Sequence, residues 1–210
     1  MTATLTSVSA TFTPPGSLAP YRGFIFDCDG TLADTMPIHQ RAWIHALEKH
    51  GATFEFGWDL FMSRAGKTIE LTVSELNAQF GTKLDPALVA ADQRACFDIL
   101  AGEVLPLAEV VAFALARKNE GFPLAVASGG DAPTVSRTLR TIGVSDWFGA
   151  VVTHEQVEHG KPAPDMFLLA AKLIGVPPEQ CLVFEDSLLG IEAAERAGMG
   201  AVLVARASTP

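Results

Sequence analysis

The sequence predicts an α/β fold: a parallel sheet with helices on both faces, plus a small all-helical domain inserted after the first strand. Short apolar segments alternate with helical segments through the second half of the chain, an order that implies crossover connections and a parallel sheet. By contrast, 36–103 shows helical periodicity and no convincing strand. We therefore expect a loose tail over 1–20, a core made of 21–35 and 104–210, and a helical insertion at 36–103.

The first strand is expected at 24–26, where a short apolar run indicates a strand buried on both faces. Asp27 and Asp29 follow one residue apart, and Gly30 comes next. Ligands of open α/β sheets bind at the carboxyl ends of the strands, so chemistry is expected at these two acids. Crowded carboxylates are costly unless a positive group joins them, most simply a divalent cation.

The insertion is expected to consist of amphipathic helices. A first helix begins near Met36 and Pro37, has apolar residues at helical spacing, and is closed by Gly51. Further helices are expected within 57–101. Their apolar residues form two stripes that we expect to be buried: Ile69, Val73, Leu76 and Phe80 in one, and Leu88, Ala91, Ala95 and Ile99 in the other.

The rest of the core alternates between the two kinds of element. Helices are expected at 107–118, 132–142, 165–174 and 190–197, and strands at 123–127, 150–152, 181–184 and 201–204. Glycines follow the expected helices at Gly143 and Gly198, as is usual where a helix ends.

Polar residues stand where these strands end. They are Ser128 after the second strand, Lys161 in the loop after the third, and Glu185 and Asp186 after the fourth. Parallel strands present their carboxyl ends at one edge of a sheet, so these side chains should converge with the first two acids. Carboxylates hold Mg²⁺, while a hydroxyl, glycine amides and a lysine neutralise phosphate oxygens. The combination favours phosphoryl chemistry.

Composition excludes several other classes. The net charge of -9 argues against a nucleic-acid-binding surface, which would be basic. No apolar run reaches the length of a membrane span, and 1–20 lack the apolar core of a signal peptide. The 3 cysteines form no C-x-x-C pair, which fits a reduced compartment. We therefore expect a cytoplasmic protein that binds neither nucleic acid nor membrane, and we separately expect it to be a monomer that binds a small phosphorylated substrate.

Four segments resemble, in order, the motifs of the haloacid dehalogenase superfamily, within a similarity that covers nearly all of 23–205. The segments are Asp27-Cys28-Asp29-Gly30-Thr31, Ala127-Ser128-Gly129, Gly160-Lys161-Pro162-Ala163-Pro164-Asp165 and Phe184-Glu185-Asp186-Ser187. The branch it resembles contains small sugar-phosphate phosphatases, such as fructose-1-phosphatases, and β-phosphoglucomutases. This resemblance implies a Rossmann-like core and identifies the insertion as a cap domain.

The resemblance also implies roles for individual residues. Asp27 would attack phosphorus and form an aspartyl phosphate. Asp29 would protonate the leaving oxygen and later deprotonate the attacking water. Mg²⁺ would be held by the Asp27 carboxylate, the Asp29 backbone carbonyl and Asp186, with Glu185 close by.

The resemblance also implies which residues bind the phosphoryl group and the rest of the substrate. Ser128 and Lys161 would bind the phosphoryl group, and Gly30, Thr31 and Gly129 are predicted to contribute to the substrate site. Each polar residue also has an ordinary structural alternative. Ser128, Glu185 or Asp186 could cap a helix, and Lys161 could be a solvated loop residue.

The cap is expected to contact the part of the substrate beyond the phosphate. Candidate specificity residues are His39, Trp43, Arg64 and Lys67. Their alternative is the ordinary polar face of a helix. Hinges are expected near Asp34-Thr35 and Leu105-Pro106.

Two departures favour a phosphatase over a mutase. The stretch Gly66-Lys67-Thr68-Ile69 lacks the arginine of the mutase Gly-x-Ser-Arg pattern, and Ser128-Gly129-Gly130-Asp131 differs from its Ser-x-Ser-Lys-Asn. A dehalogenase is disfavoured because those enzymes use no metal and lack the second acid. A phosphorylated signalling receiver, the alternative from another class, would have no large insertion after its first strand.

Two other patterns are set aside. Gly66-Lys67-Thr68 lacks the upstream glycine and preceding strand of a phosphate loop. His154 and His159 are five residues apart rather than four, so they would not share a helix face as zinc ligands do.

Overall fold

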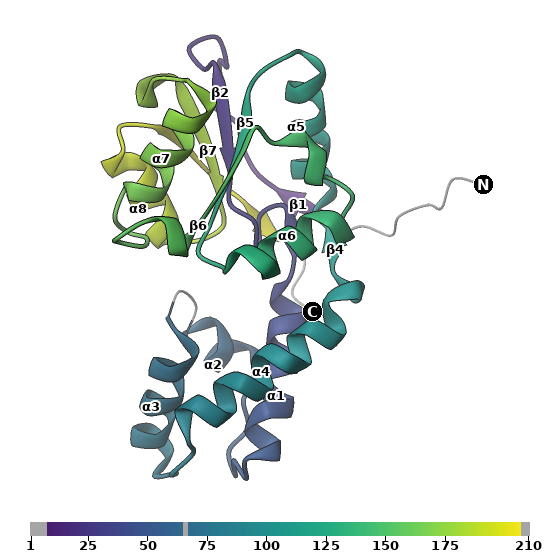
Figure 1. Ribbon diagram of the computed structural model, residues 1–210, viewed down its shortest axis with the longest axis vertical. Coiled ribbons are helices and arrows are strands. Elements are labelled where there is room, and N and C mark those ends of the chain that lie inside the picture. The colour runs from purple at the N-terminus through teal and green to yellow at the C-terminus, as the bar shows by residue number, and fades with distance from the viewer. Residues whose placement is uncertain (1–7, 65–66, 207–210) are drawn as a thin grey trace, which may run out of the picture. The chain divides into compact units, whose positions relative to one another are not determined.

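The computed structural model describes residues 8–64 and 67–206 and divides the chain into two compact units (Figure 1). The first unit, the core, consists of Met1–Thr35 together with Val104–Pro210. The second unit is Met36–Glu103. No helix among the described residues is both long and apolar enough to cross a membrane.

The core is built on a five-stranded sheet whose neighbouring strands are all parallel. In spatial order the strands are β6 (Ala150–Thr153), β5 (Leu124–Ser128), β2 (Gly23–Phe26), β7 (Cys181–Glu185) and β8 (Gly200–Leu203). The predicted α/β class is confirmed. The central strand β2 pairs with β5 on one side and β7 on the other. Connections therefore run outward in both directions from β2, which brings the ends of β2, β5 and β7 together.

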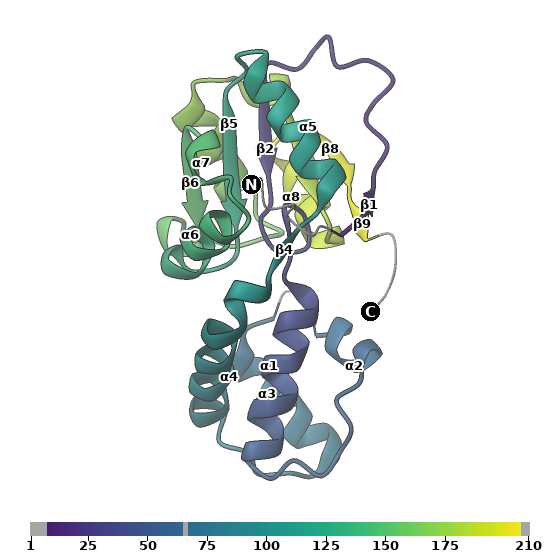
Figure 2. The ribbon, with the colours of Figure 1, turned by 90° about the vertical axis from the view of Figure 1, so that its right-hand side faces the viewer.

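Helices cover both faces of the sheet. They are α5 (Ala108–Asn119), α6 (Ala132–Thr141), α7 (Asp165–Ile174) and α8 (Leu188–Arg196). Figures 1 and 2 show α7 and α8 on one face and α5 and α6 on the other. Reversing the direction of travel across the sheet places right-handed crossovers on opposite faces, which explains this division.

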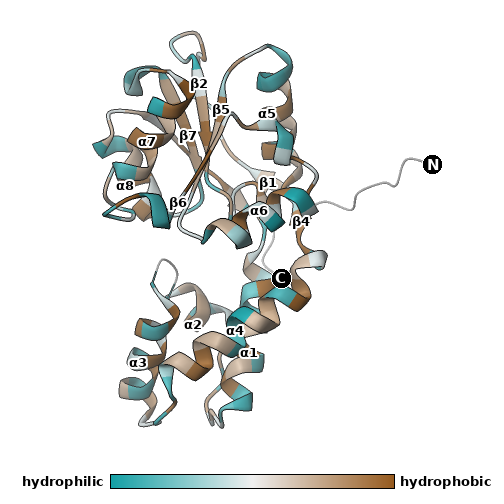
Figure 3. Ribbon diagram, in the orientation of Figure 1, coloured by the Kyte–Doolittle hydropathy of each residue, from teal (hydrophilic) through white to brown (hydrophobic). Residues whose placement is uncertain are grey.

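The two faces of β2 are packed by different kinds of side chain, because successive residues of a strand point in opposite directions. Ile25 lies in a cluster with buried alanines of α7 and α8. On the opposite face, the rings of Phe26 and Phe184 stack with centroids 5.0 Å apart, and Phe24 meets Phe113 of α5 edge to face at 5.6 Å. Figure 3 shows the central strands in the brown of apolar residues.

The N-terminal segment differs from the loose tail expected over 1–20. Strand β1 (Ala10–Thr11) pairs antiparallel with β9 (Ala205–Arg206), and the Ala10 amide donates to Glu109 at 2.6 Å. The Phe12 ring packs edge to face against Phe184, with centroids 5.4 Å apart. For these residues the tail prediction is wrong, because polar composition does not reveal a pairing partner almost 200 positions away. Residues 1–7 lie outside the described residues.

Two short strands stand where the chain leaves and re-enters the core. β3 (Ala33–Asp34) and β4 (Leu105–Pro106) form an antiparallel ladder at the positions where hinges are expected. Arg206 holds Asp34 through two hydrogen bonds of 2.8 Å, one to each carboxylate oxygen. Short 3₁₀ helices complete the path: η1 (Ala101–Glu103), η2 (Ser145–Trp147), η3 (His154–Gln156) and η4 (Pro178–Gln180).

The second unit is all-helical among its described residues. Its helices are α1 (Met36–Lys49), α2 (Trp58–Met62), α3 (Ile69–Phe80) and α4 (Pro86–Leu100). Val73 and Leu76 of α3 are fully buried, whereas Phe80 of the same predicted stripe is 38% exposed. Trp43 packs on Phe56 inside this small core, with ring centroids 5.4 Å apart. It is buried in this core, and its predicted role in specificity stays a prediction.

The stripe predicted for α4 is also wrong. Leu88 and Ile99 are 55% and 82% exposed, and the buried face instead contains Val89, Gln93 and Phe97. Both sets repeat at helical spacing, so period alone does not distinguish them. Phe97 is 3% exposed and its ring stacks on His39 of α1, with centroids 4.1 Å apart, so packing within this unit buries the face that carries Phe97.

Candidate active site

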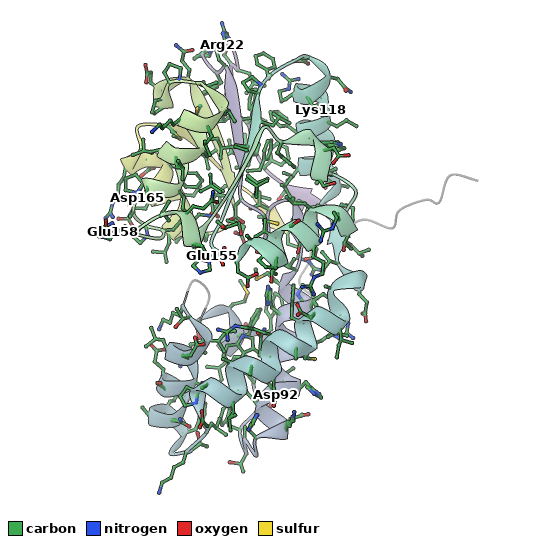
Figure 4. The ribbon with its side chains drawn as sticks, viewed as in Figure 1. Arg22, Asp92, Lys118, Glu155, Glu158 and Asp165 are labelled. Carbon is green, nitrogen blue, oxygen red and sulfur yellow. The ribbon has the colours of Figure 1, made fainter. Side chains whose placement is uncertain are left out.

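The predicted polar residues of the core meet at the carboxyl edge of the sheet. Asp27 follows β2, Ser128 ends β5, and Glu185 ends β7 with Asp186 directly after it. Lys161 reaches them from the loop between β6 and α7. Figure 4 shows Glu155 at this edge, just beyond β6, whereas Arg22 and Lys118 lie at the opposite end of the sheet.

Lys161 joins two of the acids. Its Nζ lies 2.7 Å from Asp27 Oδ1 and 2.5 Å from Glu185 Oε1. The lysine side chain is only 13% exposed, so the alternative of a solvated loop residue is wrong. Burial by itself would lower the pKa of Lys161, but the carboxylates of Asp27 and Glu185 raise it above its usual value. The two carboxylates therefore favour the charged form of the lysine.

Glu185 is held by Ser187 as well as by Lys161. Its Oε2 accepts from the Ser187 amide at 2.8 Å and from the Ser187 hydroxyl at 3.2 Å. Ser187, not Glu185 or Asp186, is the N-cap of α8, because its hydroxyl accepts from the Gly190 amide at 3.0 Å. Sequence reasoning placed Ser187 in the fourth motif and Gly190 at a helix start, but assigned neither of them a role in the site. A serine placed three residues before a glycine at a helix start was the signal available.

Three acids lie close enough to hold one metal ion. Oxygens of Asp27, Glu185 and Asp186 all lie within 4.8 Å of one another. Burial, with the neighbouring carboxylates, raises the pKa of Asp27 to about 7 and that of Asp186 to about 9. Lys161 offsets only part of this effect at Asp27. A dense set of carboxylate oxygens with excess negative charge is the donor set that hard divalent cations prefer, so these residues fit such an ion.

Gly30 provides room for Asp186. Its φ is +84°, and a Cβ built on it would lie 2.1 Å from Asp186 Oδ2. Any side chain here would displace this acid, so Gly30 has a structural role whether or not it touches substrate. Thr31 is fully buried beneath the turn. The substrate contacts predicted for Gly30 and Thr31 stay predictions.

Asp29 points to a different partner. Ser128 Oγ donates to Asp29 Oδ2 at 3.4 Å and accepts from the Gly130 amide at 3.1 Å. Ser128 does not cap the following helix, because Asp131 is the N-cap of α6. The Asp29 carboxylate is not one of the three grouped acids, which fits the prediction that only its backbone carbonyl faces the metal. That contact and the role of Gly129 stay predictions.

The three remaining candidates belong to the second unit. His39 stacks on Phe97 with ring centroids 4.1 Å apart. Arg64 Nη1 and Lys67 Nζ both bind Glu75, at 2.6 and 2.7 Å. Their predicted contacts with substrate stay predictions. Gly66, part of the phosphate-loop pattern set aside above, lies outside the described residues.

The two histidines of the pattern set aside above have separate partners. His154 Nδ1 lies 3.0 Å from the Gly130 carbonyl, and His159 Nδ1 lies 3.2 Å from Asp165. The two histidines therefore contact different groups, the Gly130 carbonyl in one case and Asp165 in the other. Cys28 is buried between the two motif acids, and burial raises the pKa of its thiol well above the usual value. Such a thiol is a poor nucleophile.

The family model of haloacid dehalogenase-like hydrolases matches residues 21–198, and the chain belongs to this family. Among curated relatives, the fructose-1-phosphate phosphatase YqaB of Escherichia coli is 39% identical over 87% of this chain and 95% of its own. Hexitol phosphatase A of Escherichia coli is 31% identical over 90% of this chain and 86% of its own.

The solved structures agree with the fold. CbbY from Rhodobacter sphaeroides, crystallised with phosphate, matches with a TM-score of 0.75 and 26% identity. The match covers 86% of this chain and 84% of that one. The predicted family is therefore confirmed by sequence and by structure.

Proposed function

We propose that this hydrolase is a Mg²⁺-dependent phosphatase that cleaves a small sugar phosphate through an aspartyl-phosphate intermediate. The observation that carries the proposal is the bridge from Lys161 to Asp27 and Glu185, beside Asp186 at the carboxyl edge of the sheet. The substrate class rests on the relatives, two of which are named as phosphatases of fructose 1-phosphate and of hexitols.

In the first half-reaction an oxygen of Asp27 attacks phosphorus while the bond from phosphorus to the sugar oxygen breaks. Asp29 gives its proton to that leaving oxygen, and the sugar departs with an intact hydroxyl. Ser128 supports this assignment, because its hydroxyl donates to the Asp29 carboxylate, which lies outside the group of three acids that includes Asp27. Separate environments for two acids are what separate roles require.

In the second half-reaction water attacks phosphorus and displaces the Asp27 carboxylate. Asp29, now ionised, takes a proton from that water, so inorganic phosphate leaves and both acids return to their starting forms. Lys161 would neutralise phosphoryl oxygens, since its ammonium already contacts the nucleophilic carboxylate at 2.7 Å. Glu185 holds the lysine in place from the other side at 2.5 Å.

Asp27, Asp186 and the backbone carbonyl of Asp29 would hold Mg²⁺, with Glu185 near it. When bound, the ion supplies positive charge next to the phosphoryl oxygens. The fit rests on the grouped oxygens and on their excess negative charge. A cytoplasmic location and a monomeric state are further predictions that the sequence alone supports.

A phosphomutase is the second candidate. One solved structure similar to this chain is described as a putative β-phosphoglucomutase from Thermotoga maritima, with 27% identity and a TM-score of 0.70. The chain lacks the mutase arginine after Gly66 and the mutase residues after Ser128. Hydrolysis is therefore the better supported activity.

The test is phosphate release from a panel of sugar phosphates, with Mg²⁺ and with a chelator. The panel contains fructose 1-phosphate, glucose 6-phosphate, β-glucose 1-phosphate, 2-deoxyglucose 6-phosphate and phosphogluconate. Release that needs Mg²⁺, with a clear preference for one sugar, is the expected result. Isomerisation of β-glucose 1-phosphate without release would indicate a mutase. No turnover of any ester would overturn the proposed function.

A further inference from the structure

The turn η3, which follows β6, is hydrogen-bonded to the glycine loop that follows β5. His154 Nδ1 lies 3.0 Å from the carbonyl oxygen of Gly130. Next to it, Glu155 Oε2 accepts from the Ala132 amide at 3.1 Å. A carbonyl oxygen only accepts, so His154 must present an Nδ1–H to Gly130. Two side chains of η3 are therefore hydrogen-bonded to the peptide units before and after Asp131, one to the Gly130 carbonyl and one to the Ala132 amide.

The same loop continues inward to the candidate active site. The amide of Gly130 donates to Ser128 Oγ at 3.1 Å, and this hydroxyl donates to Asp29 Oδ2 at 3.4 Å. A Cβ built on Gly130 would lie 3.4 Å from Ser128 Oγ and 3.6 Å from Asp29 Oδ2. The backbone of Gly130 thus contacts the Ser128 hydroxyl directly and is linked to Asp29 through it.

This loop needs an external restraint. Gly129 and Gly130 are consecutive glycines, and glycine has the least restricted backbone of all residues. Without a restraint at the Gly130 carbonyl, rotation about Gly130 would turn its amide away from Ser128. Asp131 fixes only the start of α6, by accepting from the Thr134 amide at 2.9 Å.

The turn that supplies the restraint is itself well held. Thr153 and Gln156 form a capping box, in which the Thr153 amide donates to Gln156 at 2.8 Å. Thr153 of β6 is also the register partner of Ser128 in β5. His154 is therefore the first residue after the paired residues of β5 and β6. The parallel register places it opposite the loop that contains Gly129 and Gly130.

We propose that His154 is a positioning residue for phosphoryl transfer, an inference that rests on the proposed function. It acts through Gly130 on Ser128, and through Ser128 on Asp29. Its contribution is to keep the Ser128 hydroxyl directed at the reacting phosphoryl group and at the acid. His154 itself touches neither substrate nor metal.

The test compares His154→Ala with His154→Asn. The side-chain amide of asparagine can place an N–H near the position of Nδ1, whereas alanine leaves the Gly130 carbonyl without a donor. His159→Ala is the matched control, because this exposed histidine lies in the same segment and contacts Asp165 instead. Readouts are kcat and KM for an aryl phosphate, and binding of inorganic phosphate with Mg²⁺ by calorimetry.

Loss of one such hydrogen bond is expected to lower kcat/KM and phosphate affinity by about fivefold in His154→Ala. His154→Asn should recover most of both, and His159→Ala should match the wild type. Equal values for the alanine and asparagine variants, whether normal or reduced, would overturn the positioning role alone. Wild-type protein that neither turns over the ester nor binds phosphate would overturn the proposed function as well.

Discussion

A Cβ built on Gly190 would lie 1.9 Å from Oε1 of Glu185, the same oxygen that accepts from Lys161 at 2.5 Å. The first turn of α8 therefore closes directly over the carboxylate that steadies the lysine. Room for the glutamate, and with it the position of the lysine, depends on the absence of a single methyl group.

Gly190→Ala should move Glu185 and loosen Lys161. Overpacking at a buried contact costs about 1–3 kcal/mol, and we expect the melting temperature and kcat to fall together. Gly102→Ala is the matched control, because a Cβ there meets nothing within 4 Å. Thermal denaturation and initial rates measure both effects. A fully active Gly190→Ala enzyme would show that activity does not depend on the position of the Glu185 side chain.

Lys161→Met should abolish most activity and destabilise the core. The substitution leaves Glu185, only 1% exposed, without the cation that its Oε1 binds. Removing one partner of a buried pair costs about 3–5 kcal/mol, and denaturant unfolding would measure the loss. The double variant Lys161→Met with Glu185→Gln should recover stability and not turnover. Recovery of turnover would contradict a direct role for the lysine.

Asp27→Asn should remove turnover and keep the fold. The carboxamide has nearly the same shape but is a very weak nucleophile, so no aspartyl phosphate forms. Initial rates with the preferred phosphate ester measure turnover, and circular dichroism of the same sample checks that the fold is kept. Near-normal rates in Asp27→Asn would exclude the covalent mechanism.

The stability of the metal-free protein should depend on pH, and bound Mg²⁺ should weaken this dependence. The folded-state pKa of Asp27 is raised from 3.8 to about 7, and that of Asp186 from 3.8 to about 9. The metal-free fold thus keeps protons that the unfolded chain has lost, so its stability should fall as pH rises from about 4 to about 9. Asp27→Asn should flatten this slope.

Added Mg²⁺ should oppose that loss, because the ion competes with protons for the same carboxylates. The rise in melting temperature on adding Mg²⁺ should therefore be larger at pH 8 than at pH 5, and a chelator should reverse it. Asp186→Asn should reduce the rise. A gain from Mg²⁺ that is equal at both pH values would argue against binding at these acids.

Phe12→Ala tests the N-terminal segment. The Phe12 ring packs against Phe113 and Phe184, at 5.9 and 5.4 Å between centroids. Because this ring is only partly buried, we expect a loss of about 2 kcal/mol in unfolding free energy. Thr13→Ala is a suitable control, since this neighbouring residue is exposed. An unchanged unfolding curve would mean that the segment is dispensable to the core.

Much of the fold follows from local pattern. Buried parallel strands appear as apolar runs, and they end where polar residues begin, so Asp27, Ser128 and Glu185 could be placed at strand ends in advance. The parallel sheet then brings these ends together. The family resemblance added the assignment of roles, and the family itself is confirmed.

Other features could not be predicted in this way. Helical period fits both faces of α4, and only packing within its unit selects Phe97 over Ile99. The same applies to Trp43, which sequence suggested as a specificity residue and packing places in a core. A polar N-terminal segment gave no sign of its pairing with β9, because strand partners far apart in sequence leave no local trace.

The sequence by itself therefore determined the class of fold, the order of its elements and the residue types at the edge of the sheet. Tertiary structure decided how those residues are held. Lys161 lies between Asp27 and Glu185, Gly190 leaves room for that glutamate, and His154 meets the glycine loop. The reason is physical. Helical periodicity and the positions of strand ends are local properties of the sequence. A hydrogen bond between residues of different strands or loops depends on the strand register and on the distance between the two side chains, which only the packed chain fixes.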